Sequence, residues 1–316
     1  GFLELPGLDN RFSLAGRSES RRALAGVVAR YAPDVVHTHT SKAGWLGRSV
    51  ARSAGVRVVA HTYHGHVLRD YFGPIRSWVL RRLERRLAKQ TNVLVAVSES
   101  CAEELAELGV VPRSRLQVIP PAVAAGDGLD RQAARAALGL APEAWVVACV
   151  GRLVPIKRVD RFVDAVAGQT EIRGHVVGDG PLRDQLRQQA AGVDRVEFRG
   201  ADANIRRHLA AYDAVVLSSV REGCPLVAIE AFEAGVPVVG FDVPGVRDVL
   251  GPWGGGLTVA ESAGAKGLGE ALVRLRQEED LRQRCVAEGL AKRGQFAPEQ
   301  VAKRLLAAYE AVLEVR

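Results

Sequence analysis

The sequence predicts an α/β protein with two domains, each built on a parallel β-sheet. Continuous apolar runs such as residues 145–150 recur along the chain, and they are typical of parallel strands buried on both faces. Segments with helical spacing of apolar residues separate these runs, so strands and helices alternate. The chain has 316 residues, of which 47% are hydrophobic, and this is enough for two such domains.

The front half begins with two strands joined by a helix. Residues 34–39 and 56–66 each form an apolar run that ends in histidines. Residues 43–53 between them have helical character. This arrangement predicts a βαβ unit with both histidine clusters at the carboxyl edge of one sheet.

Two further strands complete the predicted front half. Residues 90–98 form an apolar run, and Ser100 with Glu103 then follows the pattern of a helix capping box. Residues 116–121 form a short fourth strand that ends in prolines. Residues 122–130, rich in Gly, Ala and Asp, are expected to be the linker between the domains.

Residues 75–87 form an amphipathic and very basic helix. Ile75, Val79, Leu83 and Leu87 recur at helical spacing, which favours packing of this stripe on the sheet. The arginines that lie elsewhere on the helix are Arg81, Arg82, Arg85 and Arg86. They are either a solvated face or a surface that attracts anionic lipid headgroups.

The second half carries two basic side chains after a buried strand. The apolar run 145–150 is followed by a loop that contains Arg152 and Lys157. Another strand, 175–177, ends in a tight turn at 178–180. Ligands of open α/β sheets bind at this carboxyl edge. An arginine can hold a phosphate through two hydrogen bonds and a lysine through a point charge, so we expect an anion site here.

Two glutamates follow the next strand, residues 211–219. Glu222 lies in the turn after it. Pro225 suits the first turn of the next helix, because its missing N–H would have no intrahelical partner there. The N–H groups of Leu226 and Val227 are then free to bind a phosphate. Glu230 lies more than a turn into the helix.

A single glutamate near a helix N-terminus is usually structural, because the helix dipole favours a negative charge there. The second interpretation depends on the combination. Two cations, a helix N-terminus and two carboxylates share one edge of one predicted sheet. That set suits a nucleotide with a diphosphate and a hydroxyl-rich group.

These segments resemble glycosyltransferase family 4. Three motifs carry the resemblance, and they are Val150-Gly151-Arg152-Leu153 with Lys157, Val177-Gly178-Asp179-Gly180-Pro181-Leu182, and Glu222-Gly223 with Pro225-Leu226, Glu230-Ala231 and Ala234-Gly235-Val236-Pro237. Their order and spacing are specific, and the resemblance covers nearly the whole chain from about Asp34 onward. Members have the GT-B fold, in which two Rossmann-like domains with parallel sheets face a cleft. They transfer a sugar from a nucleoside diphosphate sugar with retention at the anomeric carbon.

The resemblance implies a role for each matched residue. Arg152 and Lys157 hold the donor diphosphate and stabilise the leaving phosphate. Glu222 bonds to the donor sugar, and Glu230 to the ribose hydroxyls. The other residues implied in the donor site are Gly151, Gly178, Gly180, Gly223, Cys224, Pro225, Leu226 and Val227. Family members need no metal ion, because the cations act on the phosphates, and no cofactor is expected beyond the nucleotide sugar.

One segment departs from the family pattern. Family members usually show two glycines and then a glutamate where this chain has Pro244, Gly245 and Asp248. The local turn is therefore expected to differ from that of other members.

Most of the seven histidines lie between positions 37 and 66. In the family, a histidine that ends the second strand of this region reaches the donor sugar. His64 is the best match, with His66 and His61 as alternatives. The spacing is also typical of metal ligands, although no Cys or carboxylate lies beside it to complete a site. A purely structural role at the strand ends is the third interpretation.

Composition and charge narrow the partners. The net charge of +7 suits anionic substrates or a membrane surface. Nucleic acid is not expected, because the chain shows no helix-turn-helix, zinc-ligand spacing or aromatic-rich basic sheet. A Rossmann dehydrogenase is not expected either, because neither glycine turn supplies Gly-x-Gly-x-x-Gly with an acid at the required distance.

Four scattered cysteines predict reduced thiols and a cytoplasmic protein. The sequence contains no signal peptide and no apolar run long enough to span a bilayer. Contact with the inner face of the cell membrane, if made, is therefore peripheral.

We expect three segments. Residues 1–122 form an N-terminal, acceptor-side Rossmann-like domain, 123–296 a nucleotide-sugar domain, and 297–316 a C-terminal helix that packs back on the first domain. The first domain is expected to be incomplete, because family members carry further strands and a glycine-rich loop before residues 34–39.

The expected function is transfer of a sugar from a nucleoside diphosphate sugar, with a UDP-sugar favoured. The acceptor is a hydroxyl, lipid-linked in one interpretation, within cell-envelope polysaccharide or glycoconjugate synthesis. The alternative is a nucleotide-sugar-binding protein without turnover.

Overall fold

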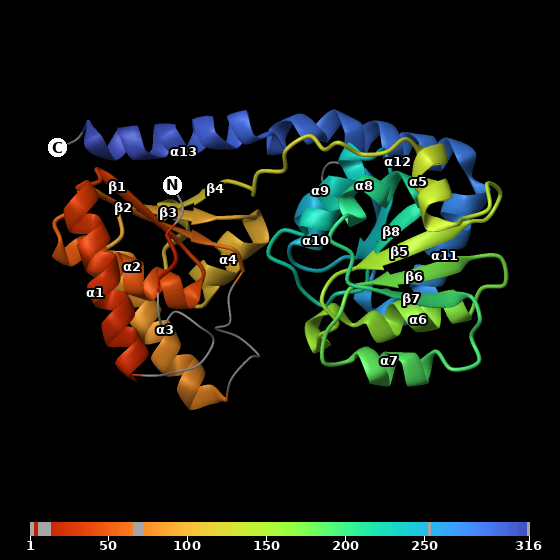
Figure 1. The fold of residues 1–316 in the computed structure, drawn as a ribbon, viewed down its shortest axis with the longest axis horizontal. Helices are drawn as coiled ribbons and strands as arrows, with labels where there is room; N and C mark the ends of the chain where they lie inside the picture. The colour runs from red at the N-terminus through yellow and green to blue at the C-terminus, as the bar shows by residue number, and fades with distance from the viewer. Residues whose placement is uncertain (1–2, 6–13, 66–72, 252–253, 315–316) are drawn as a thin grey trace. The chain divides into compact units, whose positions relative to one another are not determined.

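The computed structural model of the chain describes residues 3–5, 14–65, 73–251 and 254–314 (Figure 1). Its contacts divide the chain into two compact units. Unit 1 comprises residues 1–120 and 302–316, and unit 2 comprises residues 121–301. Each unit contains a parallel sheet with helices, as predicted for an α/β chain.

The described part of unit 1 contains a four-stranded parallel sheet in the order β1-β2-β3-β4. The strands are β1 (Val35–His39), β2 (Val58–Tyr63), β3 (Val93–Ala96) and β4 (Leu116–Val118). All four were predicted from their apolar runs. Thr38 pairs with His61 across β1 and β2, so the histidines that end these strands lie at one edge.

Helices pack on the strands of unit 1. They are α1 (Leu14–Tyr31), α2 (Ser41–Ser53), α3 (Pro74–Lys89), α4 (Glu99–Glu107) and, from residue 302, α13 (Pro298–Leu313), with a 3₁₀ turn at η1 (Arg113–Arg115). Val50 and Val59 belong to one buried cluster of this unit, and Leu94 and Leu105 to another.

The prediction for the apolar stripe of α3 is wrong. Leu87 is buried, but Ile75, Val79 and Leu83 are 78%, 50% and 37% exposed. The helix turns Glu84 inward instead. Most of the stripe therefore faces solvent, together with the arginines.

An ion pair explains which face of α3 points inward. The Arg48 guanidinium on α2 donates to both carboxylate oxygens of Glu84, at 2.6 and 3.0 Å. Tyr63 Oη donates to the same carboxylate at 2.8 Å. The Arg48 side chain is only 2% exposed. A buried guanidinium without its partner costs several kcal/mol, so the orientation of α3 is tied to this pair rather than to its apolar stripe.

The predicted capping box is also wrong. Helix α4 begins at Glu99, and the hydroxyl of Ser98 accepts a hydrogen bond from the N–H of Cys101 at 3.2 Å. Ser100 lies inside the helix and is buried. Both serines suit a cap by type, and the end of β3 decides which one is used.

Unit 2 contains a six-stranded parallel sheet in the order β10-β9-β8-β5-β6-β7 within its described residues. The strands are β5 (Val146–Val150), β6 (Arg173–Val177), β7 (Val196–Gly200), β8 (Ala214–Leu217), β9 (Val238–Phe241) and β10 (Gly256–Val259). The chain runs outward from β5 through β6 to β7 and then returns to β8 on the other side of β5. Such a reversal is a topological switch point, where open α/β sheets bind ligands.

The helices of unit 2 cover this sheet. They are α5 (Arg131–Leu138), α6 (Val159–Ala167), α7 (Arg183–Gln189), α8 (Ile205–His208), α9 (Leu226–Glu233), α10 (Val246–Leu250), α11 (Gly264–Gln277) and α12 (Glu279–Lys292), with 3₁₀ turns at η2 (Pro155–Lys157), η3 (Leu209–Ala211), η4 (Glu261–Ala263) and η5 (Arg293–Phe296). The inner face of α6 is buried, with Phe162 and Val166 fully inaccessible.

Candidate functional site

Two loops meet at the carboxyl ends of β5 and β8, which are hydrogen-bonded neighbours. We call residues 151–158 the β5 loop and residues 218–225 the β8 loop. The N–H of Val220 donates to the carbonyl of Ile156 at 3.1 Å. Ser218 Oγ donates to the carbonyl of Lys157 at 2.9 Å. These two hydrogen bonds therefore fix the two loops against each other at the switch point.

Lys157 and Glu222 form an ion pair between these loops. Lys157 Nζ donates to Glu222 Oε1 at 2.6 Å, and Ser219 Oγ donates to the same oxygen at 2.5 Å. The two side chains are 25% and 12% exposed. An ammonium group has three donors, so Lys157 can keep this bond and still donate to a ligand.

Glycines of the β6 turn, residues 178–180, lie against the β5 loop. Gly178 has φ +144°, and a Cβ there would be 1.9 Å from the carbonyl oxygen of Gly151. A Cβ on Gly180 would be 2.5 Å from the carbonyl oxygen of Leu153. These predicted donor-site glycines are required for backbone packing in the free protein, because no side chain fits between the turn and the loop.

A cavity of about 10 Å³ lies between the loops, lined in part by Gly151, Arg152, Lys157 and Glu222. This volume holds about one water molecule, so a phosphate can bind only outside its mouth. Arg152 is exposed and forms no ion pair with a carboxylate of the described residues. Its guanidinium donors are thus available beside Lys157.

The helix N-terminus lies where the sequence predicts it. Helix α9 begins at Leu226, with Pro225 as the residue before it, and Leu226 is 48% exposed. The first amides of a helix, here those of Leu226 and Val227, have no intrahelical acceptor. Gly223 and Cys224 belong to the β8 loop that leads into the helix, and Cys224 is partly buried against the core.

The segment that departs from the family pattern holds the β8 loop in place. The N–H of Glu222 donates to the carbonyl of Pro244 at 2.9 Å. Gly245 has φ +80°, and a Cβ there would be 2.2 Å from the carbonyl oxygen of Glu222. The Asp248 carboxylate accepts a hydrogen bond from the N–H of Gly245 at 2.9 Å. Sequence reasoning missed this support, as it missed Ser218 and Ser219.

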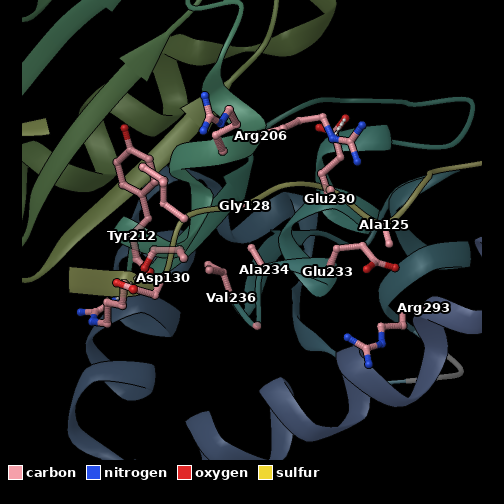
Figure 2. A pocket seen from close by; sticks show the side chains of 16 residues that line it. Ala125, Gly128, Asp130, Arg206, Tyr212, Glu230, Glu233, Ala234, Val236 and Arg293 are labelled. Carbon is pink, nitrogen blue, oxygen red and sulfur yellow. Dashed lines mark hydrogen bonds and ion pairs between the residues drawn. The ribbon is translucent and has the colours of Figure 1, made fainter. Parts of the chain in front are cut away.

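Glu230 lines a different cavity from Glu222. This cavity of about 480 Å³ is bounded by residues 125–131, α8 and the end of α9 (Figure 2). Arg206 Nε lies 3.4 Å from Glu230 Oε1. Burial raises the pKa of Glu230, and the charge of Arg206 opposes that rise. Arg206 also donates to the carbonyl of Ala124 at 2.6 Å, which ties the carboxylate to residues that precede α5.

His64 lies in unit 1, directly after β2. Its Nε2 is 2.8 Å from Nδ1 of His39, and both side chains are exposed. Although each side chain reaches solvent, partial burial of its ring lowers the pKa of both imidazoles. A neutral imidazole pair shares one proton in this bond, so one ring donates and the other accepts.

His37 connects β1 to its neighbour and to α13. Its two ring nitrogens lie 2.7 Å from Thr62 Oγ1 and 2.5 Å from Tyr309 Oη. Burial, together with the nearby imidazoles of His39 and His64, lowers the pKa of His37 to about 4.

His61, an alternative to His64, points away from the strand ends. It is 2% exposed, and its Nδ1 is 2.8 Å from Thr38 Oγ1. A Cβ on Gly44 of α2 would be 2.4 Å from its ring. Burial and the charge of Arg48 lower the pKa of His61 to about 2. The other alternative, His66, lies outside the described residues.

A metal centre was the rival interpretation of the histidines. Within the described ranges, no group of three or more His, Cys, Asp or Glu side chains is arranged to hold a metal ion. All four cysteines lie in described segments, and no disulfide joins them.

The sequence matches two protein families. Residues 5–125 match the family described as Glycosyltransferase Family 4, and residues 144–278 match Glycosyl transferases group 1. The UDP-Gal:alpha-D-GlcNAc-diphosphoundecaprenol alpha-1,3-galactosyltransferase of Escherichia coli is 32% identical, over 76% of this chain and 66% of that protein. A D-inositol 3-phosphate glycosyltransferase of Actinosynnema mirum is also 32% identical, over 90% of this chain and 75% of that protein.

Solved structures share the fold. HepE from Anabaena, in complex with UDP, superposes with a TM-score of 0.78 at 20% identity, over 92% of this chain and 82% of that chain. Sucrose-phosphate synthase from Thermosynechococcus elongatus gives a TM-score of 0.80 at 22% identity, over 96% and 79%. The predicted GT-B fold is confirmed. With the matched families and the 32% identical relatives, it shows that this chain belongs to glycosyltransferase family 4.

Proposed function

We propose that this chain transfers a sugar from a UDP-sugar to a hydroxyl acceptor with retention of anomeric configuration and without a metal ion. The observation that carries the proposal is the ion pair of Lys157 and Glu222 at the switch point, beside Arg152, which has no carboxylate partner among the described residues. Two relatives support the choice of donor. The E. coli relative is named for UDP-galactose, and HepE was solved with UDP.

In the proposed reaction, the bond between the anomeric carbon and the diphosphate oxygen breaks while the acceptor oxygen bonds to the same carbon. Arg152, Lys157 and the N-terminus of α9 offset the negative charge that develops on the departing diphosphate. The acceptor attacks from the face that the diphosphate leaves, and the diphosphate takes the acceptor proton. No side chain is therefore assigned as a nucleophile.

Glu222 binds the hydroxyls of the donor sugar in this proposal. Lys157 and Ser219 already orient its carboxylate, so little side-chain freedom is lost when the sugar arrives. In unit 1, His64 offers a neutral imidazole that can bind a sugar hydroxyl. A neutral imidazole suits this role, because it binds a hydroxyl without competing for the diphosphate.

Glu230 binds the ribose hydroxyls in its carboxylate form. Its contact with Arg206 is long, at 3.4 Å, so the ribose can displace the guanidinium at small cost. The raised pKa of Glu230 adds a pH signature. Nucleotide affinity should fall on acidification at a pH above the ordinary range of a glutamate, because protonation removes the acceptor charge.

We further propose that the acceptor is lipid-linked and that the reaction takes place at the cytoplasmic face of the cell membrane, in glycoconjugate synthesis. The name of the E. coli relative, with its diphosphoundecaprenol acceptor, supports this. None of the described helices is long and apolar enough to cross a membrane. Contact with the membrane is therefore proposed as peripheral.

Calorimetric titration tests the donor assignment. UDP, GDP and NAD are titrated against the wild type and Glu230→Ala, with Glu270→Ala as the control, because Glu270 is 66% exposed on α11 and does not line this cavity. UDP should bind and lose about tenfold in affinity when Glu230 is replaced, because a charge-assisted hydrogen bond is worth about 1.5–3 kcal/mol. Silence from UDP, or equal loss in both variants, contradicts the proposal.

Turnover separates the enzyme from a binding protein without activity. Release of UDP from a UDP-sugar, measured with and without a chelator, is expected to be unaffected by the chelator. Binding without any release would favour the binding protein.

A further inference from the structure

Helix α3 exposes an apolar face that nothing in the donor site uses. Ile75, Trp78, Val79 and Leu83 are 78%, 56%, 50% and 37% exposed. These four account for half of the large hydrophobic side chains that are exposed in the described residues. Exposed apolar side chains are ordinary when scattered singly, but a group on one helix marks an interaction surface.

The same helix carries charge of one sign on its exposed side. Its exposed basic residues are Arg76, Arg82, Arg85, Arg86 and Lys89. Glu84 is its single acid, and that carboxylate is turned inward to Arg48. All charged side chains on the exposed side of α3 are therefore cationic.

Apolar and basic side chains share one stripe of α3. Ile75, Val79, Arg82 and Arg86 follow the spacing i, i+4, i+7 and i+11, which places them on one face of a helix. The apolar members occupy its first two turns, and the basic members follow. The Arg82 guanidinium lies 5.4 Å from the centre of the Trp78 ring, so the aromatic and cationic parts are in contact.

We propose that this surface, defined by Ile75, Trp78, Val79, Arg82, Leu83 and Arg86 and called the α3 face, binds the surface of an anionic lipid bilayer. The apolar side chains enter the boundary between headgroups and acyl chains, and the arginines bind lipid phosphates. This proposal deepens the proposed function, because it names the surface that brings the enzyme to a lipid-linked acceptor. Only the role in reaching that acceptor rests on the proposed function.

Charge complementarity selects the bilayer as the occupant. An anionic leaflet attracts basic residues by about 1 kcal/mol each. Tryptophan prefers the interface between headgroups and acyl chains. An amphipathic helix with a basic face lies in that plane with its apolar side chains inserted. The inward turn of Glu84 removes the one charge on the helix that an anionic surface would repel.

Vesicle sedimentation of the full chain tests the proposal. Vesicles that contain phosphatidylglycerol are compared with purely zwitterionic vesicles, at low and high salt. Arg82→Gln with Arg86→Gln should weaken binding to the anionic vesicles about 30-fold, from the loss of two cations. Trp78→Ser with Val79→Ser should weaken it as well. Leu306→Ser is the matched control, because Leu306 is 55% exposed on another helix of unit 1.

Two readouts keep folding and function apart from lipid binding. UDP affinity depends on unit 2 alone in the proposed function, so all these variants should keep it even if lipid binding fails. Lipids brominated in their acyl chains should quench wild-type fluorescence more than that of Trp78→Phe. Absence of binding to anionic vesicles, equal binding of all variants, or equal quenching of both proteins overturns the proposal.

Discussion

The two sheets present opposite chemistry at their carboxyl edges. In unit 1 the edge of β1 and β2 carries imidazoles whose pKa values are lowered, so they are neutral near pH 7. In unit 2 the edge of β5 and β8 carries the ion pair of Lys157 and Glu222 beside Arg152, which pairs with no described carboxylate. The same type of parallel sheet therefore offers hydrogen bonds without charge in one unit and fixed charge in the other.

This difference follows from how each edge is supported. The imidazoles of unit 1 bond to hydroxyls and to one another, as His37 does with Thr62 and His39 with His64. The charges of unit 2 are held by opposite charge and by Ser219. A diphosphate needs cations, whereas sugar hydroxyls accept neutral partners. The comparison therefore supports our proposal that the phosphates bind to unit 2.

Removing the positive charge of Lys157 in unit 2 should have the largest effect, and that effect is on kcat. Lys157→Ala leaves Glu222, 12% exposed, without its counter-charge. In the proposed reaction it also removes a donor to the leaving diphosphate. We expect kcat to fall by about 10²–10³, as when one donor to a developing negative charge is lost. Affinity for UDP should fall less. Steady-state kinetics and calorimetry check both values.

Lys266→Ala is the matched control, since Lys266 is 87% exposed on α11. Lys157→Arg distinguishes charge from geometry. If kcat of Lys157→Ala stays within about twofold of the control, Lys157 does not act on the leaving group.

The next largest effect is expected on stability, from the backbone packing of the β6 turn against the β5 loop. Gly178→Ala would bring a Cβ to 1.9 Å from the carbonyl oxygen of Gly151, at a φ of +144°. We expect the free energy of unfolding to fall by about 3 kcal/mol, because the turn must move away from the β5 loop. Gly192→Ala is the control, because its φ is also positive, at +81°, but no atom lies within 4 Å of the added Cβ. Equal loss in both, measured by urea unfolding, would mean that only the backbone conformation matters.

Strands with continuous apolar runs were predictable, whereas two elements without a clear apolar pattern were not. The run of β8 is buried throughout, and that of β5 is buried in all but its last residue. By contrast, β7 alternates charged and apolar residues in a partly exposed strand, and α1 has no apolar stripe. Neither was predicted from the sequence, because burial on both faces and amphipathic spacing were the signals used.

The sequence predicted which loops carry the site residues, but not the contacts between those loops. Sequence placed Arg152, Lys157 and Glu222 after strands of one sheet. It could not show that β5 neighbours β8, because strand order is a long-range property. Ser219 and the support from Gly245 depend on that order. The orientation of α3 was missed for the same reason, since the partner of Glu84 lies on another helix.

The smallest expected effect is a difference between the two units in how much stability each loses as the pH falls. The folded pKa of His61 is about 2, against 6.5 for a free histidine, so the unfolded chain binds more protons below about pH 6.5. Stability of unit 1 is complete above that pH and falls as the pH drops toward 4, by about 2 kcal/mol for this group near pH 5. His37 adds to the loss. His61→Gln should flatten the profile, as measured by hydrogen exchange in β1 and β2.

Unit 2 supplies the internal control for this last prediction. His175 on β6 is 3% exposed, and burial lowers its pKa to about 4. Among the described histidines, unit 2 thus carries one group with so low a pKa, and unit 1 carries two, His37 and His61. Exchange in β5 and β8 should therefore rise less on acidification than exchange in β1 and β2, and His175→Gln should alter only the unit 2 profile. If β5 and β8 open first in acid, the neutral imidazoles do not determine the difference between the two edges.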